Sequence, residues 1–246
     1  MASPRTTNSA ERRTVDFKQF DQRHYPTLGV QEGYAEWSRT YESVVQDAMD
    51  LRIMARLSSI DWARSDRALE LACGTGRIGT WLRGQEVRRL DGVDFTPEML
   101  AQAQAKNVYD RLVQADIQQT GLAAGTYDLL VMVLADEHLP DLAPVYREAA
   151  RLASRRAMFV VVGYHPYFLM HGIPTHFDRA PGQSVAIESH VHLTSDHVKA
   201  AAAAGWLLAE MEEGVVDEEW IARKPKWAKY RSQPVSFALV WARQAA

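Results

Sequence analysis

Three acidic residues and a glycine-rich turn are the features of this sequence best suited to bind a ligand. Glu70 lies inside a predicted strand, and the turn "CGTG" follows shortly after it. Asp94 and Asp116 end the next two predicted strands. In a doubly wound sheet, the carboxyl ends of parallel strands meet at the edge where ligands bind. We therefore expect the three carboxylates and the turn to share one site.

The segment "GTGRIG", which begins at Gly74, matches the G-x-G-x-x-G pattern of dinucleotide-binding turns. Two features favour a different ligand. The carboxylate of Glu70 would repel a pyrophosphate and would suit an ammonium group. Asp94 lies eighteen residues after Gly76, a spacing that suits a carboxylate holding ribose hydroxyls. Asp116 is placed to accept a hydrogen bond from an exocyclic amine. Because Glu70 would face the pyrophosphate, a nicotinamide-dependent dehydrogenase is disfavoured.

The elements that must position these residues alternate between strand and helix. Apolar periodicity and capping signals predict strands at 67–71, 89–95, 111–116, 127–135 and 157–165, and helices at 77–83, 96–106 and 142–153. A further helix, beginning at 194, precedes the last two predicted strands, at 206–216 and 234–243. This order predicts an α/β, Rossmann-like fold with a mostly parallel sheet and helices on both faces.

The remaining segments set the expected domain organisation. Residues 1–20 are polar and predict a disordered tail, and residues 21–246 predict a single domain. A helical lid is expected at about 30–57. Two irregular stretches, 166–193 and 217–233, are long for loops in a compact domain, so we expect them to close over the ligand site.

Composition narrows the function classes. The chain has 246 residues and a net charge of −3, without the clustered Lys and Arg of a large nucleic-acid footprint. The one basic run, 223–231, is typical of a solvated face. Cys73 is the only cysteine, so the chain has no internal disulfide and a reducing compartment fits. A nucleophilic role for Cys73 is disfavoured, because a small cysteine in such a turn usually serves packing. No apolar run approaches the roughly 20 residues of a membrane span. We expect a cytoplasmic protein with no membrane or nucleic-acid partner.

Four consecutive segments carry a family resemblance: "ALELACGTGRIG", "LDGVDFTPEMLAQAQAK", "LVQADI" and "YDLLVMVLADEHLPDL". They resemble the ordered motifs of class I S-adenosylmethionine-dependent methyltransferases. They are most similar to the small-molecule branch that includes ubiquinone/menaquinone methyltransferase-like proteins. The resemblance runs from about Gly33 to Arg243 and implies a seven-stranded, mostly parallel sheet with a terminal antiparallel strand. One departure is Ala72, where the family usually has a glycine.

The resemblance also implies which residues bind S-adenosylmethionine, whose product is S-adenosylhomocysteine. Glu70 would lie near the ammonium group, Asp94 would hold the ribose, and Asp116 would take the adenine amine. The other implied contacts are to the methionine moiety (Ala72, Cys73, Gly74, Gly76), to the adenine (Phe95, Met99, Ile117) and near the sulfonium (Leu134, Ala135).

The acceptor side is predicted from histidines and aromatic residues. Methyl transfer depends mostly on positioning, and a general base helps when the acceptor starts protonated. Six of the eight histidines follow residue 164. The candidate bases are His138, His190 and His192, the last two of which would share one face of a strand. Packing roles stay open, and a metal site is not expected because the spacings match no standard site. Expected acceptor contacts are Tyr34, Trp37, Asp136, His165, His176 and Phe177.

The resulting prediction is methylation, from S-adenosylmethionine, of oxygen or nitrogen in a small, planar or aromatic metabolite, by a monomer or homodimer. An RNA or protein methyltransferase is an alternative. The net charge and the segment "LADEH", found where an "NPPY"-type signature would stand, argue against it. A non-catalytic S-adenosylmethionine-binding protein is a second alternative.

Overall fold

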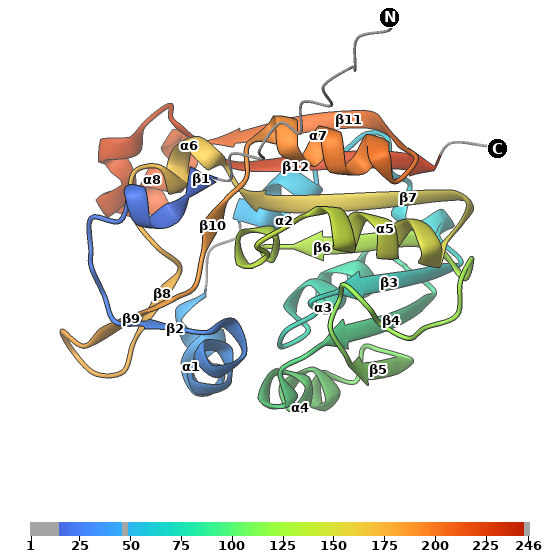
Figure 1. Cartoon of the computed structure of the whole chain (residues 1–246), viewed down its shortest axis with the longest axis horizontal. Coiled ribbons are helices and arrows are strands. Elements are labelled where there is room, and N and C mark those ends of the chain that lie inside the picture. Colours follow the sequence, from blue (N-terminus) through green and yellow to red (C-terminus); the bar gives the residue numbers. More distant parts are fainter. Residues whose placement is uncertain (1–14, 46–48, 244–246) are drawn as a thin grey trace, which may run out of the picture.

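The computed structural model describes residues 15–45 and 49–243, and its centre is a seven-stranded sheet (Figure 1). The strand order is β11-β12-β7-β6-β3-β4-β5. The parallel strands are β3 (Arg67–Leu71), β4 (Arg89–Asp94), β5 (Arg111–Gln114), β6 (Tyr127–Val133) and β7 (Ala153–Tyr164). Two antiparallel strands, β12 (Pro234–Arg243) and β11 (Trp206–Val215), extend the sheet beyond β7. The predicted α/β fold is confirmed.

Helices cover both faces of this sheet. One face packs against α2 (Met49–Met54) and α3 (Arg77–Gly84), and the other packs against α5 (Ala143–Leu152) and α7 (Thr194–Ala203), which lie in front of the sheet in Figure 1. The helix α4 (Pro97–Lys106) follows β4. Two short 3-10 turns, η2 (Trp62–Arg64) and η3 (Asp136–His138), precede β3 and follow β6.

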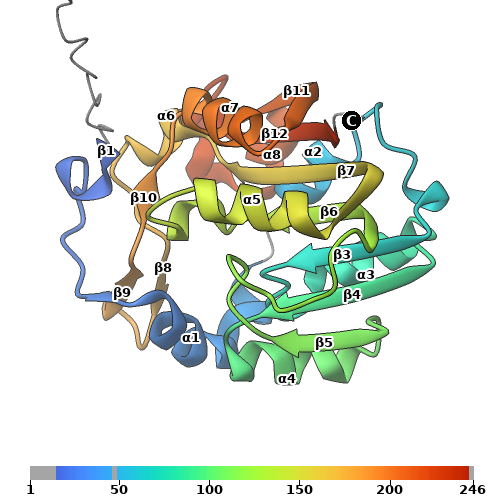
Figure 2. The same cartoon turned by 45° about the vertical axis from the view of Figure 1, so that its right-hand side comes forward.

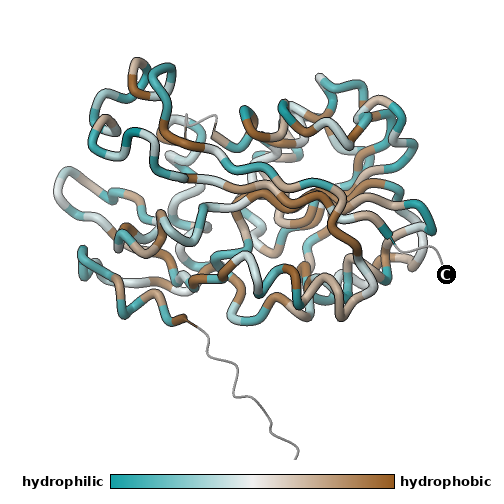
Figure 3. Tube along the Cα trace, turned by 90° about the horizontal axis from the view of Figure 1, so that it is seen from above, coloured by the Kyte–Doolittle hydropathy of each residue, from teal (hydrophilic) through white to brown (hydrophobic). Residues whose placement is uncertain are grey.

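The alternation of side chains in β6 explains the two-sided core. Leu130 and Met132 join the cluster under α5 and α7, while Leu129 and Val131 join the cluster under α2 and α3. A central parallel strand buries both faces, so a continuous apolar run is required there. Figure 3 shows the resulting band of hydrophobic strands through the middle of the molecule. The strand ends are thereby held rigidly at one edge.

A cap covers that edge and is built from two distant parts of the chain. The N-terminal part contains β1 (Val15–Asp16), η1 (Phe17–Gln19), β2 (Thr27–Leu28) and α1 (Val30–Val44). The later part contains β8 (His176–Asp178), β9 (Ser184–Ile187) and β10 (His190–Val191). β1 pairs with β10, and β2, β9 and β8 form a three-stranded sheet. Figure 2 shows the two parts side by side at the edge of the main sheet.

The expected disordered tail over residues 1–20 is wrong for its last six residues. Residues 1–14 lie outside the described residues, but β1 and η1 begin at Val15. Phe17 is buried against Leu169 and Val191, so the segment gains enough apolar contact to offset the cost of ordering it. Polar composition alone did not reveal this single anchoring side chain.

The stretch 217–233 packs through aromatic residues. It contains α8 (Glu218–Arg223) and η4 (Pro225–Tyr230), and it lies on α6 (Pro166–Leu169). The rings of Phe168 and Trp227 stack with centroids 5.2 Å apart. The basic run is partly neutralised, because Arg223 pairs with Glu219 at 2.8 Å and Arg231 pairs with Glu218.

Candidate active site

The glycine-rich turn after β3 has an unusual backbone. Ala72, Gly74 and Gly76 have φ angles of +58°, +52° and +81°. A Cβ at Gly74 would meet no atom within 4 Å, so its side of the turn is open. A Cβ at Gly76 would lie 3.3 Å from the backbone of Ala103 in α4. The turn therefore needs the left-handed region at three positions and offers backbone to a ligand.

The strain at Ala72 gives a stability prediction. Left-handed backbone costs a non-glycine residue about 1 kcal/mol or more, and glycine avoids that cost. Ala72→Gly is therefore expected to raise the free energy of unfolding by about 0.5 to 1 kcal/mol, since glycine's extra unfolded-state entropy offsets part of the gain. Urea denaturation of both proteins checks this. A loss of stability would contradict a strained Ala72.

Asp94 holds the turn to the end of β4. Its Oδ2 accepts a hydrogen bond from the Gly74 N–H at 2.8 Å, and its Oδ1 accepts one from the Thr96 N–H at 2.8 Å. The side chain is buried, and burial raises the pKa of this carboxyl, although the backbone hydrogen bonds oppose the shift. Each oxygen keeps a lone pair, so Asp94 can still accept from a ligand hydroxyl.

A cavity of about 170 Å³, here called the strand-end cavity, opens beside Asp94. It receives side chains from α1, from the ends of β3 to β6 and from η3, and its walls are largely apolar. It is lined by Val30, Tyr34, Tyr41, Ala72, Asp94, Phe95, Thr96, Asp116, Ile117, Gln118, Val133, Leu134, Ala135, His138 and Leu139. The structure thus gathers most of the predicted cofactor residues at one place, together with Tyr34 and His138 from the predicted acceptor side.

The other predicted cofactor residues lie behind this lining. Glu70, Cys73 and Met99 are all buried. The Tyr109 hydroxyl donates to Glu70 Oε2 at 2.7 Å, and burial raises the pKa of Glu70 to about 8. Burial also raises the pKa of the Cys73 thiol, which agrees with the expectation that it is not a nucleophile.

The raised pKa of Glu70 predicts a pH dependence of stability. Its usual pKa is 4.5, so its contribution to folding is fully present below about pH 4.5 and is lost as the pH rises through 8. Glu70→Gln keeps the acceptor for Tyr109 and does not ionise. We expect the variant to exceed the wild type in free energy of unfolding above pH 8, by an amount on the order of 4 kcal/mol. Denaturation from pH 5 to 9 checks this, with the exposed Glu86→Gln as control; parallel curves would contradict it.

His138 is held with a defined tautomer at the cavity. Its Nδ1 lies 2.7 Å from the Glu188 carbonyl oxygen, which can only accept, so Nδ1 carries the hydrogen. Its Nε2 therefore accepts from the Tyr34 hydroxyl, 2.9 Å away. Burial lowers the pKa of His138 to about 4 and raises the pKa of Tyr34. Both side chains are neutral at pH 7, and the lone pair of Nε2 faces the Tyr34 hydroxyl, which also lines the cavity.

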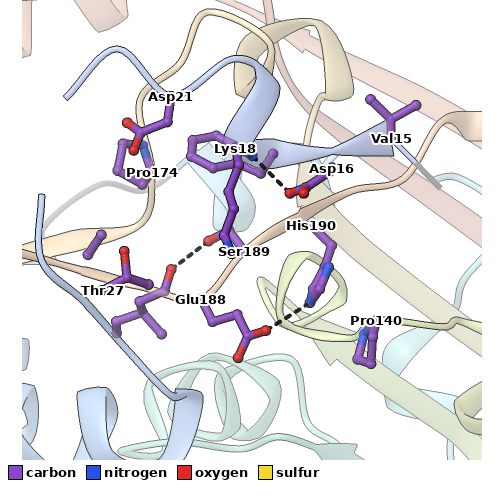
Figure 4. Close-up of a pocket in the computed structure, with 13 residues that line it drawn as sticks. Val15, Asp16, Lys18, Asp21, Thr27, Pro140, Pro174, Glu188, Ser189 and His190 are labelled. Carbon is purple, nitrogen blue, oxygen red and sulfur yellow. Dashed lines mark hydrogen bonds and ion pairs between the residues drawn. The ribbon is translucent and has the colours of Figure 1, made fainter. Parts of the chain in front are cut away.

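The other candidate histidines lie elsewhere. His190 lines a second cavity of about 310 Å³, here called the cap cavity, between residues 15–21 and 186–190 (Figure 4). His192 lies beyond β10, and its Nε2 donates to the Leu139 carbonyl at 2.6 Å. His165 pairs with Glu213 at 2.9 Å, and His176 bonds the carbonyl of Pro174. None of the four contributes to the lining of the strand-end cavity in the described residues.

The predicted aromatic contacts divide in a similar way. Tyr34 reaches the cavity, but Trp37 and Phe177 stack on each other with centroids 5.7 Å apart and form the core of the cap. Asp136 is buried, with Oδ2 lying 3.4 Å from His197 Nε2. Direct acceptor contact by these three residues stays a prediction.

Contacts that sequence reasoning missed fasten α1 across the site. Gln31 Nε2 donates to the Phe95 carbonyl at 2.7 Å, and Gln102 Nε2 donates to the Ser38 carbonyl at 2.5 Å. Glu42 accepts from Lys106 at 2.7 Å and from Thr75. Each pair joins residues more than 30 positions apart, so no local signal in the sequence could have identified them. Gln118, two residues after Asp116, is the missed lining residue with the clearest signal.

Comparison with known proteins bears on this arrangement. Residues 69–161 match the family model described as "Methyltransferase domain". The matched segment begins in β3 and ends in β7, and it includes the glycine-rich turn, Asp94 and Asp116. The chain is 34% identical over 119 residues to human methyltransferase-like protein 27. The aligned residues make up 44% of this chain and 47% of that protein. The chain is also 35% identical over 102 residues to malonyl-[acyl-carrier protein] O-methyltransferase of Enterobacter lignolyticus, covering 41% and 38%. The matched region thus spans less than half the length of these curated relatives.

The fold is also similar to a solved S-adenosylmethionine-dependent methyltransferase from Mesorhizobium loti. The TM-score is 0.64 with 21% identity, over 80% of this chain and 99% of that chain. The residues of the strand-end cavity fit the cofactor of this class. Two carboxylates, Asp94 and Asp116, can accept hydrogen bonds from hydroxyl and amine groups, Phe95 and Ile117 offer apolar surface for a planar base, and the turn is open at Gly74.

Two searches for other kinds of site found none in the described part of the chain. None of its helices is both long and apolar enough to cross a membrane. Within residues 15–45 and 49–243, no group of three or more His, Cys, Asp or Glu side chains is placed to hold a metal ion.

Proposed function

We propose that this chain transfers a methyl group from S-adenosylmethionine to an oxygen or nitrogen atom of a small, planar or aromatic metabolite. One observation carries the proposal. The strand-end cavity is lined by Asp94, Asp116 and Ala72 of the glycine-rich turn, and also by the hydrogen-bonded Tyr34 and His138. The residues expected to bind the cofactor and a neutral base thus line the same cavity.

The cofactor supplies a methyl group that is already activated on a sulfonium. Under this proposal Asp94 accepts from the ribose hydroxyls, and Asp116 accepts from the adenine amine. Phe95, Met99 and Ile117 surround the adenine. Glu70 and the turn (Ala72, Cys73, Gly74, Gly76) hold the methionine moiety, and Leu134 and Ala135 lie near the sulfonium. A cationic ammonium beside Glu70 would favour its ionised form and lower its raised pKa.

On the acceptor side, His138 acts as the general base. The Glu188 carbonyl fixes its Nδ1–H, so Nε2 is the basic atom. The Tyr34 hydroxyl donates to Nε2 and lines the cavity, which places it to pass on the acceptor's proton. His190 and His192 have partners outside this cavity, so the geometry favours His138 among the three predicted bases.

Further observations support a small acceptor. The cap residues Val30, Tyr34 and Tyr41 contribute to the walls of the cavity, whose volume is about 170 Å³. The basic run 223–231, the one candidate footprint for RNA, is partly neutralised by its own acids. We also propose that the chain belongs to the small-molecule, ubiquinone/menaquinone-like branch and acts in the cytoplasm as a monomer or homodimer. An RNA or protein substrate is the alternative outcome of the acceptor screen.

An acceptor screen tests the proposal. Purified protein is incubated with S-adenosylmethionine and pools of phenols, amines and carboxylates, with transfer RNA and a protein lysate as further arms. Mass spectrometry should detect a gain of about 14 daltons on a small molecule. A gain only on RNA or protein would replace the proposed acceptor class. Binding of S-adenosylhomocysteine without methyl consumption in any arm would support a non-catalytic binding protein instead.

A further inference from the structure

A row of buried titratable side chains leads from the strand-end cavity into the core. His138 Nε2 lies 3.7 Å from Glu137 Oε1, and Glu137 is followed by its chain neighbour Asp136. Asp136 Oδ2 lies 3.4 Å from His197 Nε2, and His197 Nδ1 lies 2.9 Å from the Tyr146 hydroxyl. All five residues are at most 9% exposed. The cavity therefore has a polar path behind its base, within an apolar core.

The two carboxyl groups in this row are costly for the fold. Asp136 is 3% exposed and Glu137 is 1% exposed. Asp136 Oδ1 and Glu137 Oε2 have no hydrogen-bond partner among the described residues. A Cβ at Gly163 in β7 would collide with Asp136 Oδ1, so a glycine leaves room for this carboxyl. Unsatisfied buried polar atoms in a native structure call for an explanation, and a catalytic role is one of the usual ones.

Two neighbouring carboxyl groups away from water do not both ionise readily. Burial and the nearby Asp136 both raise the pKa of Glu137. The titratable groups that face the pair come from every element around it: Tyr34 and Tyr41 of α1, Tyr146 of α5, His138 of η3, His192 after β10 and His197 of α7. None of these is a lysine or arginine. Glu137 therefore keeps its proton, and the pair can accept one more.

The proposed reaction releases a proton beside these buried side chains. Transfer of a methyl group from a sulfonium to a neutral O–H or N–H acceptor gives a neutral thioether, the methylated acceptor and one proton. His138 is 9% exposed, and a buried cation without a counter-charge is unfavourable. A base buried to this extent therefore needs a neighbouring group that can take the proton.

We propose that the Asp136–Glu137 pair receives the acceptor's proton from His138, an inference that rests on the proposed function. As the acceptor's lone pair bonds the methyl carbon, the C–S bond electrons stay on sulfur. The acceptor's proton passes to the Tyr34 oxygen, and the Tyr34 proton passes to His138 Nε2. The Nε2 proton then moves to Glu137 Oε1, 3.7 Å away, as the proton already on Glu137 passes to Asp136, so the pair ends with one proton more than before. His138 and Tyr34 end neutral, and total charge is conserved.

Under this inference Glu137 acts through His138 and touches neither cofactor nor acceptor. The first test is infrared spectroscopy of the purified protein at pH 7. The wild type should show the C=O stretch of a protonated carboxylic acid, shifted in D₂O. Burial also keeps Glu70 protonated at pH 7, because its pKa is about 8, so Glu70→Gln is measured first to assign its share of the band. Glu137→Gln, a nearly isosteric change, should remove the remaining share. Glu148→Gln is the control, because Glu148 is also buried but is held by Arg151 and Thr120 away from the cavity.

The second test is the pH profile of turnover with an acceptor found by the screen. Glu137→Gln should lower kcat at pH 7 about 10-fold or more and leave KM within about 2-fold. Its kcat should rise between pH 6 and 9, because the proton on His138 must then leave to solvent, while the wild type stays flat. Glu148→Gln should match the wild type in both respects.

The outcomes separate this inference from the proposed function. A wild type that methylates the acceptor, with a Glu137→Gln variant of unchanged band, kcat and pH profile, would overturn the inference and leave the function standing. A wild type that methylates nothing in the screen would overturn the function and the inference with it. Loss of the band together with an unchanged pH profile would also overturn it, because the pair would then be structural.

Discussion

Asp94→Asn is expected to weaken binding of S-adenosylhomocysteine by about 100-fold or more. The carboxylate accepts from the N–H groups of Gly74 and Thr96 at once, and an amide can accept with only one of its two ends. The variant also loses charge-assisted hydrogen bonds to the ribose, each worth about 1.5 to 3 kcal/mol. Isothermal titration calorimetry gives the dissociation constant of each protein.

The control for this prediction is Asp91→Asn in the same strand. Asp91 lies three residues before Asp94 in β4, is 1% exposed and bonds Arg67 and the Tyr127 hydroxyl, both at 2.8 Å. Removing its charge should cost about 3 kcal/mol of stability and leave the affinity for S-adenosylhomocysteine within about 2-fold. Equal losses of affinity in the two variants would show that Asp94 acts only through the stability of the fold.

His138→Ala is expected to lower kcat about 100-fold or more while cofactor affinity stays within about 3-fold. The side chain supplies the one neutral imidazole that lines the strand-end cavity in the described residues. Tyr34→Phe keeps the ring packed against Trp37 and removes only the hydroxyl, so we expect a smaller loss of about 10-fold. Steady-state kinetics with the identified acceptor, joined to calorimetry, separates the two effects.

Two further histidine variants serve as controls. His190 lies in the cap cavity beside Glu188, and His176 lies on β8, so neither lines the strand-end cavity. The variants His190→Ala and His176→Ala should therefore keep kcat within about 3-fold of the wild type. If His190→Ala lost as much activity as His138→Ala, the acceptor would have to approach from the cap cavity. An unchanged kcat in His138→Ala would show that His138 is not the general base.

The positions of Asp94 and Asp116 at the strand-end cavity could be predicted because local rules determine where a strand ends. A parallel strand ends where its apolar run ends, and the residue after it lies at the binding edge. Asp94 and Asp116 follow this rule, and both line the cavity. Glu70 does so only in part. Its place in β3 was predictable, but its bond to Tyr109 joins residues 39 positions apart, and that bond and the surrounding burial set its protonation.

The cap could not be predicted in the same way. The pairing of Val15 with Val191 joins residues 176 positions apart, and its short strands carry no periodic signal. The sequence predicts an irregular stretch at 166–193, but only the fold shows that His176 bonds the Pro174 carbonyl and His192 bonds the Leu139 carbonyl. Trp37 and Phe177 have the composition of an aromatic binding surface, but they stack on each other. Contacts of this kind depend on long-range geometry, which residue spacing does not contain.

The most direct test of the central claim is a calorimetric titration of the wild-type protein with S-adenosylhomocysteine, run in parallel with NAD. The account predicts saturable binding of S-adenosylhomocysteine with one site per chain and a dissociation constant on the order of micromolar, about −8 kcal/mol, and no heat from NAD. Binding of NAD, or no binding of S-adenosylhomocysteine by a folded protein, would contradict the assignment of the strand-end cavity.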